Sequence, residues 1–267
     1  RIAYLYLAPS LSIAPDTINS YTPIAVNLIH GNGYSIQPNV PTDKIVPLYP
    51  LFLACIYSIF GCDYFIVRII LAVIDSFTVV VSFLIANRIF SRKVAFFSSL
   101  VISFYLPFVH LFTYALSDNL FILLISLFTY FLIRMFEDKD KGSTVKCGIF
   151  LGLAILCKPI PAFVPVFIFI GWFICYYKLY RLVFKRFIIL LITLVCLICP
   201  WTLRNYITFH EFIPLTTGPA ESVLMYSYED QLKPSADNKR FSLYGEKDEI
   251  KRIQNLEGNK RTLAVFK

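Results

Sequence analysis

Two carboxylates and four cations beside apolar segments are the side chains best suited to chemistry in this sequence. They are Asp16, Asp118, Lys44, Arg68, Lys158 and Arg204. A carboxylate can accept the proton of an attacking hydroxyl or amine, and cations stabilise an anion such as a leaving phosphate. Ionisable groups near a membrane surface are costly unless they pair or function. We therefore treat this set as a candidate active site.

Each of these residues, taken alone, also has a purely structural explanation. Asp16 and Asp118 lie at the start of helical patterns, where a carboxylate caps exposed amides. Lys158, in the motif CKP, can extend its ammonium to the lipid headgroups, and Arg204, in PWTLRNY, can anchor the end of a span. These alternatives stay open from the sequence. The combination of acids and cations is what favours chemistry.

Asp75 lies deeper, eleven residues into an apolar segment. An ionised, unpaired carboxylate at that depth costs several kcal/mol. Arg68 lies two helical turns away on the same face, so we predict a structural pair or a contact inside the bundle. We also assign structural or secondary roles to Tyr21 and Tyr49.

Metal-ligand spacing is not visible among the histidines and cysteines. His30, His110 and His210 are scattered, and the seven cysteines lie in or beside apolar runs. We therefore predict no metal site from these residues and treat the cysteines as small buried hydrophobes. A divalent cation held by the two external carboxylates stays open.

Composition and charge place the chain in a membrane. Hydrophobic residues make up 57% of it and charged residues 16%, which is typical of a polytopic membrane protein. Three short loops, around residues 88–93, 134–146 and 178–186, hold eleven basic and three acidic residues and so account for the net charge of +8. Such clustering between apolar runs indicates cytoplasmic loops and excludes a nucleic-acid patch.

The apolar runs predict six spans in an all-α bundle, at about 64–87, 94–112, 119–136, 145–157, 160–177 and 187–203. With the basic loops in the cytoplasm, residues 9–63 form one external loop. The segment 47–61 is too short to cross and begins with two prolines, which favours an interfacial helix. We expect residues 2–8 to be the end of a truncated span, residues 204–267 to be external, and the chain to be a fragment.

A short amphipathic helix is predicted within this loop. Ile18, Tyr21, Ala25, Leu28 and Ile29 recur at helical spacing, and Gly31 is suited to a left-handed stop. We expect the helix to lie on the outer membrane surface with Asp16 near its start.

The sequence resembles the GT-C membrane glycosyltransferases, specifically the protein O-mannosyltransferase and aminoarabinose transferase superfamily (glycosyltransferase family 39). The resemblance rests on the order and spacing of several segments. They are Asp16 followed by YTPIAVNLIHGNGYS, then PLYPLFLACIYSIFG, the span with Arg68, SDNLF, LGLAILCKP and CPWTLRNYITFHEFIPLTTGPA. Asp118 stands where the family usually has Glu, and Lys158 stands where it commonly has Arg.

The resemblance implies inverting transfer of a sugar from a polyprenyl-phosphate donor to a lipid, glycan or protein acceptor on the outer face. Asp16 matches the acidic residue of the first external loop that is regarded as the family's catalytic centre, and it would act as a base; Asp118 is a second catalytic candidate. We expect Lys44, Lys158 and Arg204 to bind the donor phosphate. Nucleic acid is not expected as a partner.

A transporter or lipid flippase is the main rival function. It predicts polar groups near mid-membrane that are reached from both sides, whereas here only Asp75 is deep. A membrane scaffold without activity predicts no one-sided cluster of charges. We expect a multi-pass protein of a bacterial plasma membrane with its active site on the outer face.

Overall fold

The computed structural model describes residues 13–137, 141–175 and 180–218, and most of them are helical. The predicted first span and the external segment from residue 219 onward lie outside the described residues. The elements are η1 (Thr17–Tyr21), α2 (Thr22–Ile29), β1 (Ser35–Gln37), β2 (Val40–Pro41), α3 (Leu48–Phe60), α4 (Tyr64–Ile89), α5 (Arg92–Phe104), α6 (Leu106–Leu111), η2 (Phe112–Tyr114), α7 (Asp118–Glu137), α8 (Lys141–Cys157), η3 (Ile160–Phe163), α9 (Val164–Cys175) and α10 (Tyr180–Phe209).

Helices long and apolar enough to cross a membrane confirm the all-α membrane fold. In the described part of the chain they are α4, α7 and the segment Phe184–Phe209 of α10. A fourth crossing is formed if α5 and the segment Leu106–Tyr114 are taken together, with a bend of 49° between them. The break lies at Tyr105, whose backbone is extended, and Pro107 in the first turn of α6 has no amide hydrogen to donate back into α5.

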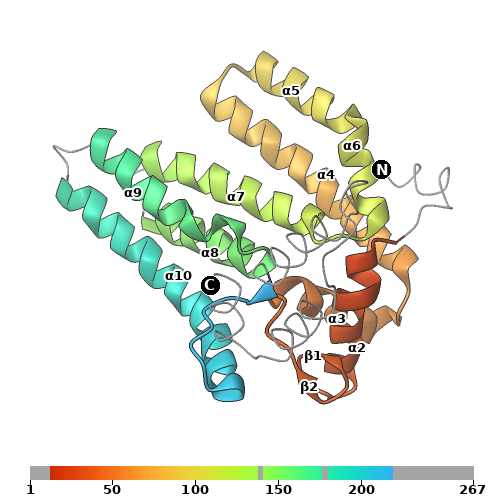
Figure 1. Cartoon of the computed structure of the whole chain (residues 1–267). Coiled ribbons are helices and arrows are strands. Elements are labelled where there is room, and N and C mark those ends of the chain that lie inside the picture. Colours follow the sequence, from red (N-terminus) through yellow and green to blue (C-terminus); the bar gives the residue numbers. More distant parts are fainter. Residues whose placement is uncertain (1–12, 138–140, 176–179, 219–267) are drawn as a thin grey trace, which may run out of the picture. The chain divides into compact units, whose positions relative to one another are not determined.

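The chain divides into two compact units. Among the described residues, the first unit comprises residues 13–41 and the described part of 47–198, and the second comprises residues 42–46 and 199–218. In the first unit α4 packs against α5 and α7, and α7 packs against α8. Figure 1 shows α4 and α5 as an antiparallel pair.

Apolar side chains on α4 and α5 remain exposed. They include Phe77, Val80, Phe97, Val101 and Phe104, each more than half exposed. Because these helices satisfy their own backbone hydrogen bonds, such faces can lie directly against lipid. The buried core of the first unit instead gathers where α2, α3 and η2 meet one end of α4 and α8.

The loop that the sequence predicts to be external folds, within residues 17–41, as a helix followed by a hairpin. Pro23 has no amide hydrogen to donate to the preceding turn, and the helix widens into the π turn of η1 just before it. Just beyond the end of α2, Gly31 has the predicted positive φ of 78°. The buried Asn27 donates to the carbonyls of Ser35 (2.9 Å) and Ile36 (3.2 Å), which fixes the hairpin against α2.

Glycines on α8 allow close approach to α10. A Cβ at Gly148 would lie 2.9 Å from the Thr193 Cβ and 3.1 Å from the Leu190 carbonyl oxygen, and one at Gly152 would lie 2.9 Å from Leu197. Two small residues four positions apart are typical of tightly packed membrane helices.

Gly148→Ala is therefore expected to destabilise the protein by about 1–3 kcal/mol, because α10 must shift to make room for the methyl group. The matched control is Gly171→Ala on α9, where an added Cβ meets no atom within 4 Å. Thermal unfolding in detergent should show a lower Tm for the first variant only. Equal Tm values for the two variants would show that the α8–α10 contact is loose.

Candidate functional site

The link at residues 113–118 is the centre of the polar contacts in the first unit. It joins η2 to α7 and contains Ala115, which has a positive φ of 54°. This left-handed conformation turns the backbone, and it is uncommon for a residue with a Cβ. The contacts that hold the link come from segments far away in sequence.

Several distant parts of the chain donate hydrogen bonds to the carbonyl groups of this link. The Thr17 hydroxyl donates to the Ala115 carbonyl at 2.9 Å, and the Tyr49 hydroxyl donates to the same oxygen. The Arg68 Nε donates to the Thr113 carbonyl at 2.7 Å. Residues of η1, α3 and α4 thus fix the backbone that leads directly to Asp118.

Asp118 and Lys158 form an ion pair. The Lys158 Nζ lies 2.7 Å from the Asp118 Oδ1, and the side chains are 26% and 32% exposed. Lys158 follows the last residue of α8, and Asp118 is the first residue of α7. The ammonium also lies 6.0 Å from the ring centre of Phe121. Because the pair is neither fully buried nor fully solvated, its ammonium remains within reach of an anionic ligand.

Tyr21 is close to both candidate carboxylates. Its hydroxyl lies 3.5 Å from the Ser117 Oγ, and its ring packs edge-on against Tyr49 with 4.9 Å between ring centres. Burial raises the pKa of Tyr21, the hydrogen bond with Ser117 lowers it, and the charges of Asp16 and Asp118 raise it again. Tyr21 therefore stays a neutral hydrogen-bonding group near both acids at physiological pH.

Asp16 does not act as a helix cap. Its backbone is already helical, and among the described residues its side chain makes no capping hydrogen bond to η1. The side chain is exposed. By contrast, Asp63 accepts a hydrogen bond from the Phe65 amide at 2.7 Å and does cap α4. The capping explanation that the sequence left open for Asp16 therefore does not hold.

Asp75 lies inside the bundle on α4. It is 3% exposed and sits two turns from Arg68 on the same helix. Its burial agrees with the prediction that it faces the bundle interior rather than lipid. Arg68 also donates a hydrogen bond to the Thr113 carbonyl and so supports the 113–118 link.

Asn119 is a residue that the sequence reasoning missed. It is 1% exposed, and neither polar atom of its side chain has a hydrogen-bond partner among the described residues. Burying an amide in this way is unfavourable, so such groups usually meet a water or a ligand. Thr17 and Ser117 were also missed. The only signal for any of them is that they are polar neighbours of Asp16 and Asp118.

The second unit holds Lys44 and Arg204. The Arg204 Nη1 donates to the Thr42 carbonyl at 2.9 Å and to the Asn205 Oδ1 at 3.0 Å. Its guanidinium also lies 5.1 Å from the Trp201 ring centre. Arg204 thus has a structural role in its unit, and phosphate binding by Lys44 and Arg204 remains a prediction.

Residues of the basic loops lie at the end of the first unit that is opposite to the 113–118 link. Arg88 pairs with Glu137, and Arg186 donates to the Met135 carbonyl. Arg68 and Arg88 are twenty residues apart on α4, or about 30 Å at 1.5 Å per residue. That distance equals the thickness of the bilayer core. The contacts of Asp118 and those of the basic loops therefore lie a membrane thickness apart.

Groups of three or more metal-binding side chains do not occur among the described residues.

Tyr49→Phe tests the importance of the 113–118 link. The variant removes one of two donors from the buried Ala115 carbonyl, at an expected cost of about 1–2 kcal/mol in the free energy of unfolding. Burial raises the pKa of Tyr49 well above its ordinary value, so the hydroxyl is a proton donor at every pH at which the protein is stable. The measurement is denaturant unfolding of the variant beside Tyr206→Phe, whose ring is exposed. No difference between the two would mean that the link does not depend on Tyr49.

Comparison with protein families gives one match. The family model for dolichyl-phosphate-mannose-protein mannosyltransferases matches residues 39–203. Neither the curated proteins nor the solved structures gave a match. The matched range includes the 113–118 link, Asp118 and Lys158.

Proposed function

The chain belongs to the dolichyl-phosphate-mannose-protein mannosyltransferase family, and we propose from this that it transfers mannose from a polyprenyl-phosphate carrier to an acceptor at the outer membrane face. Membership shows a membrane glycosyltransferase of the GT-C superfamily, which acts in general on a lipid-linked sugar donor and an acceptor. The donor, the side of the membrane and the residue roles are our proposal. The observation that carries it is the Asp118–Lys158 pair, beside Tyr21 and a membrane thickness from the basic loops.

In the proposed reaction Asp16 is the general base. An acceptor hydroxyl or amine attacks the anomeric carbon and passes its proton to the Asp16 carboxylate. A bond from the acceptor to this carbon forms while the bond from the carbon to the phosphate oxygen breaks, so the configuration inverts. The exposed carboxylate of Asp16 suits this role, because it is not occupied by capping the helix.

Lys158 stabilises the departing lipid phosphate. The phosphate leaves as a stable anion, so it needs a cation more than it needs an acid. Asp118 holds the Lys158 ammonium by the 2.7 Å contact and keeps it at the start of α7. In a poorly hydrated site this attraction is stronger than in water. Asp118 therefore acts through Lys158 in this proposal.

Radiolabelled mannosyl-phosphoryl-polyprenol and purified full-length protein provide the test. The proposal predicts release of polyprenyl phosphate and transfer of label to the acceptor. A flippase would move the donor between leaflets without cleaving it, and a scaffold would leave it unchanged. Intact donor after prolonged incubation with several acceptor classes would contradict the proposal. A bacterial plasma membrane, with undecaprenyl phosphate as the carrier, is our proposal for the setting.

A further inference from the structure

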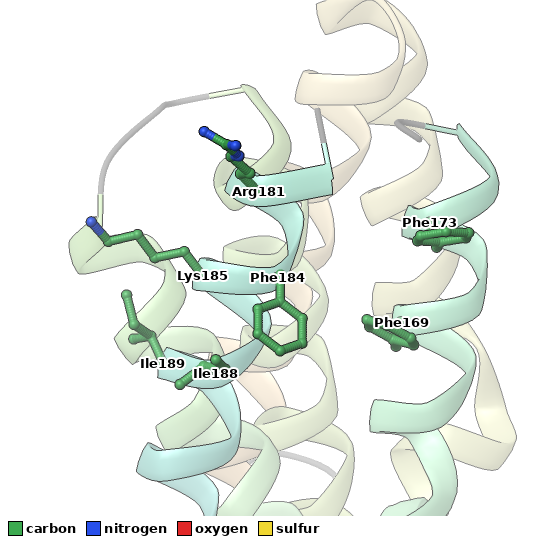
Figure 2. A pocket seen from close by; sticks show the side chains of 7 residues that line it. All are labelled: Phe169, Phe173, Arg181, Phe184, Lys185, Ile188 and Ile189. Atoms are coloured by element: carbon green, nitrogen blue, oxygen red, sulfur yellow. The ribbon is translucent and has the colours of Figure 1, made fainter. Parts of the chain in front are cut away.

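A cavity of about 530 Å³ lies between α9 and α10, in the first unit. Figure 2 shows Phe169 and Phe173 on α9 facing Phe184 on α10 across it. Phe173 is 50% and Phe184 57% exposed, so both rings remain open to whatever fills the space. The volume falls in the range of about 300–1,000 Å³ that is usual for sites of small molecules.

Two cations lie at the start of α10 beside this cavity. Arg181 and Lys185 are the charged members of its lining, and both are exposed. They are four residues apart, so they lie one turn apart on the same side of the helix. A phosphate group that lies between them can contact both cations. The cavity thus combines an apolar interior with a cationic edge.

The cationic edge lies at the basic-loop end of the first unit. Arg186, next to Lys185, donates to the Met135 carbonyl near the end of α7, where Arg88 pairs with Glu137. The positive-inside rule assigns this end to the cytoplasm. The cytoplasmic leaflet is rich in anionic lipids, and basic pockets between membrane helices bind their headgroups.

We propose that the cavity between α9 and α10 binds an anionic glycerophospholipid of the cytoplasmic leaflet. Arg181 and Lys185 bind its phosphate headgroup, and an acyl chain lies against the phenylalanine rings. The occupant is distinct from the sugar donor, whose proposed site beside Lys158 lies at the other end of the unit. The inference depends on the membrane setting and the charge distribution, not on the proposed reaction.

The test uses full-length protein in phosphatidylcholine nanodiscs with a small fraction of phosphatidylglycerol that carries a photoactivatable acyl chain. Illumination followed by peptide mapping should place the cross-links in residues 164–175 and 180–190. The double variant Arg181→Gln/Lys185→Gln should lower this labelling by about tenfold to thirtyfold. The matched control is Arg92→Gln/Lys93→Gln, which removes two exposed cations from the same end and should leave the labelling unchanged.

Two further arms use the unaltered protein and do not depend on any variant folding. A photoactivatable phosphatidylcholine should label these peptides far less than phosphatidylglycerol does, and equal labelling would overturn the proposal. Unlabelled phosphatidylglycerol should compete for the cavity at least as well as undecaprenyl phosphate at the same mole fraction. Stronger competition by undecaprenyl phosphate would assign the cavity to the carrier lipid and overturn the proposal. Full labelling of the Arg181/Lys185 variant would do the same.

Discussion

Asp16→Asn is expected to lower mannose transfer by about 100- to 10,000-fold while leaving the folded protein in the membrane. The amide cannot accept the acceptor's proton, and the loss of a general base has this range of effects. Folding should be retained, because the side chain is exposed and makes no capping bond to its helix. The measurement is kcat with saturating donor and acceptor, together with the amount of folded protein in detergent.

Asp63→Asn is the matched control for Asp16. Asp63 is also an exposed carboxylate of the same loop, but it caps α4 through the Phe65 amide. Asparagine caps a helix as well as aspartate does, so both stability and transfer should stay at the level of the unaltered protein. Near-normal transfer by Asp16→Asn would remove Asp16 from the mechanism.

Lys158→Gln is expected to lower kcat/KM for the donor by about 100- to 1,000-fold, the effect of removing one group that stabilises a developing anion. Lys158→Arg should keep most of the activity, because arginine also binds phosphate. The matched control is Lys146→Gln on α8, the helix that ends just before Lys158. The Lys146 ammonium lies 5.4 Å from the Phe131 ring centre. If Lys158 only extends its ammonium to the lipid headgroups, then Lys158→Gln, Lys158→Arg and Lys146→Gln should all have the same kcat/KM for the donor.

The Asp118–Lys158 pair allows a double-mutant cycle. If Asp118 acts only by holding Lys158, then adding Asp118→Asn to Lys158→Gln should lower transfer no further. Independent, additive losses would show that Asp118 contacts the substrates itself. The stability of each variant is measured in parallel, so that lost ion pairing is separated from lost catalysis.

Features of the fold that depend on neighbouring residues could be predicted from the sequence. The apolar run after residue 63 predicted a span, and α4 occupies Tyr64–Ile89. Gly31 has the positive φ expected of a helix stop. The bend at Tyr105 was not predicted within the run at 94–112, although Pro107 gives a physical reason for it. The hairpin at 35–41 was also missed, because it depends on Asn27 bonding the backbone eight residues away.

The candidate site shows what sequence reasoning cannot supply. Asp118 and Lys158 were both selected for their charge, but their direct contact joins residues forty positions apart. Thr17 and Tyr49 act on a backbone carbonyl, and no side-chain pattern shows where that acceptor lies. Asn119 stands out only because its side chain is buried, and this burial depends on how α7 packs against the rest of the first unit.

The side of the membrane on which Asp16 lies decides whether it can serve a site on the outer face. In a cysteine-free background, single Asp16→Cys and Lys93→Cys variants are treated in intact cells with a membrane-impermeant maleimide. If the site is on the outer face, position 16 is labelled in intact cells and position 93 only after permeabilisation. Labelling of position 93 in intact cells, with position 16 protected until the membrane is opened, would contradict it.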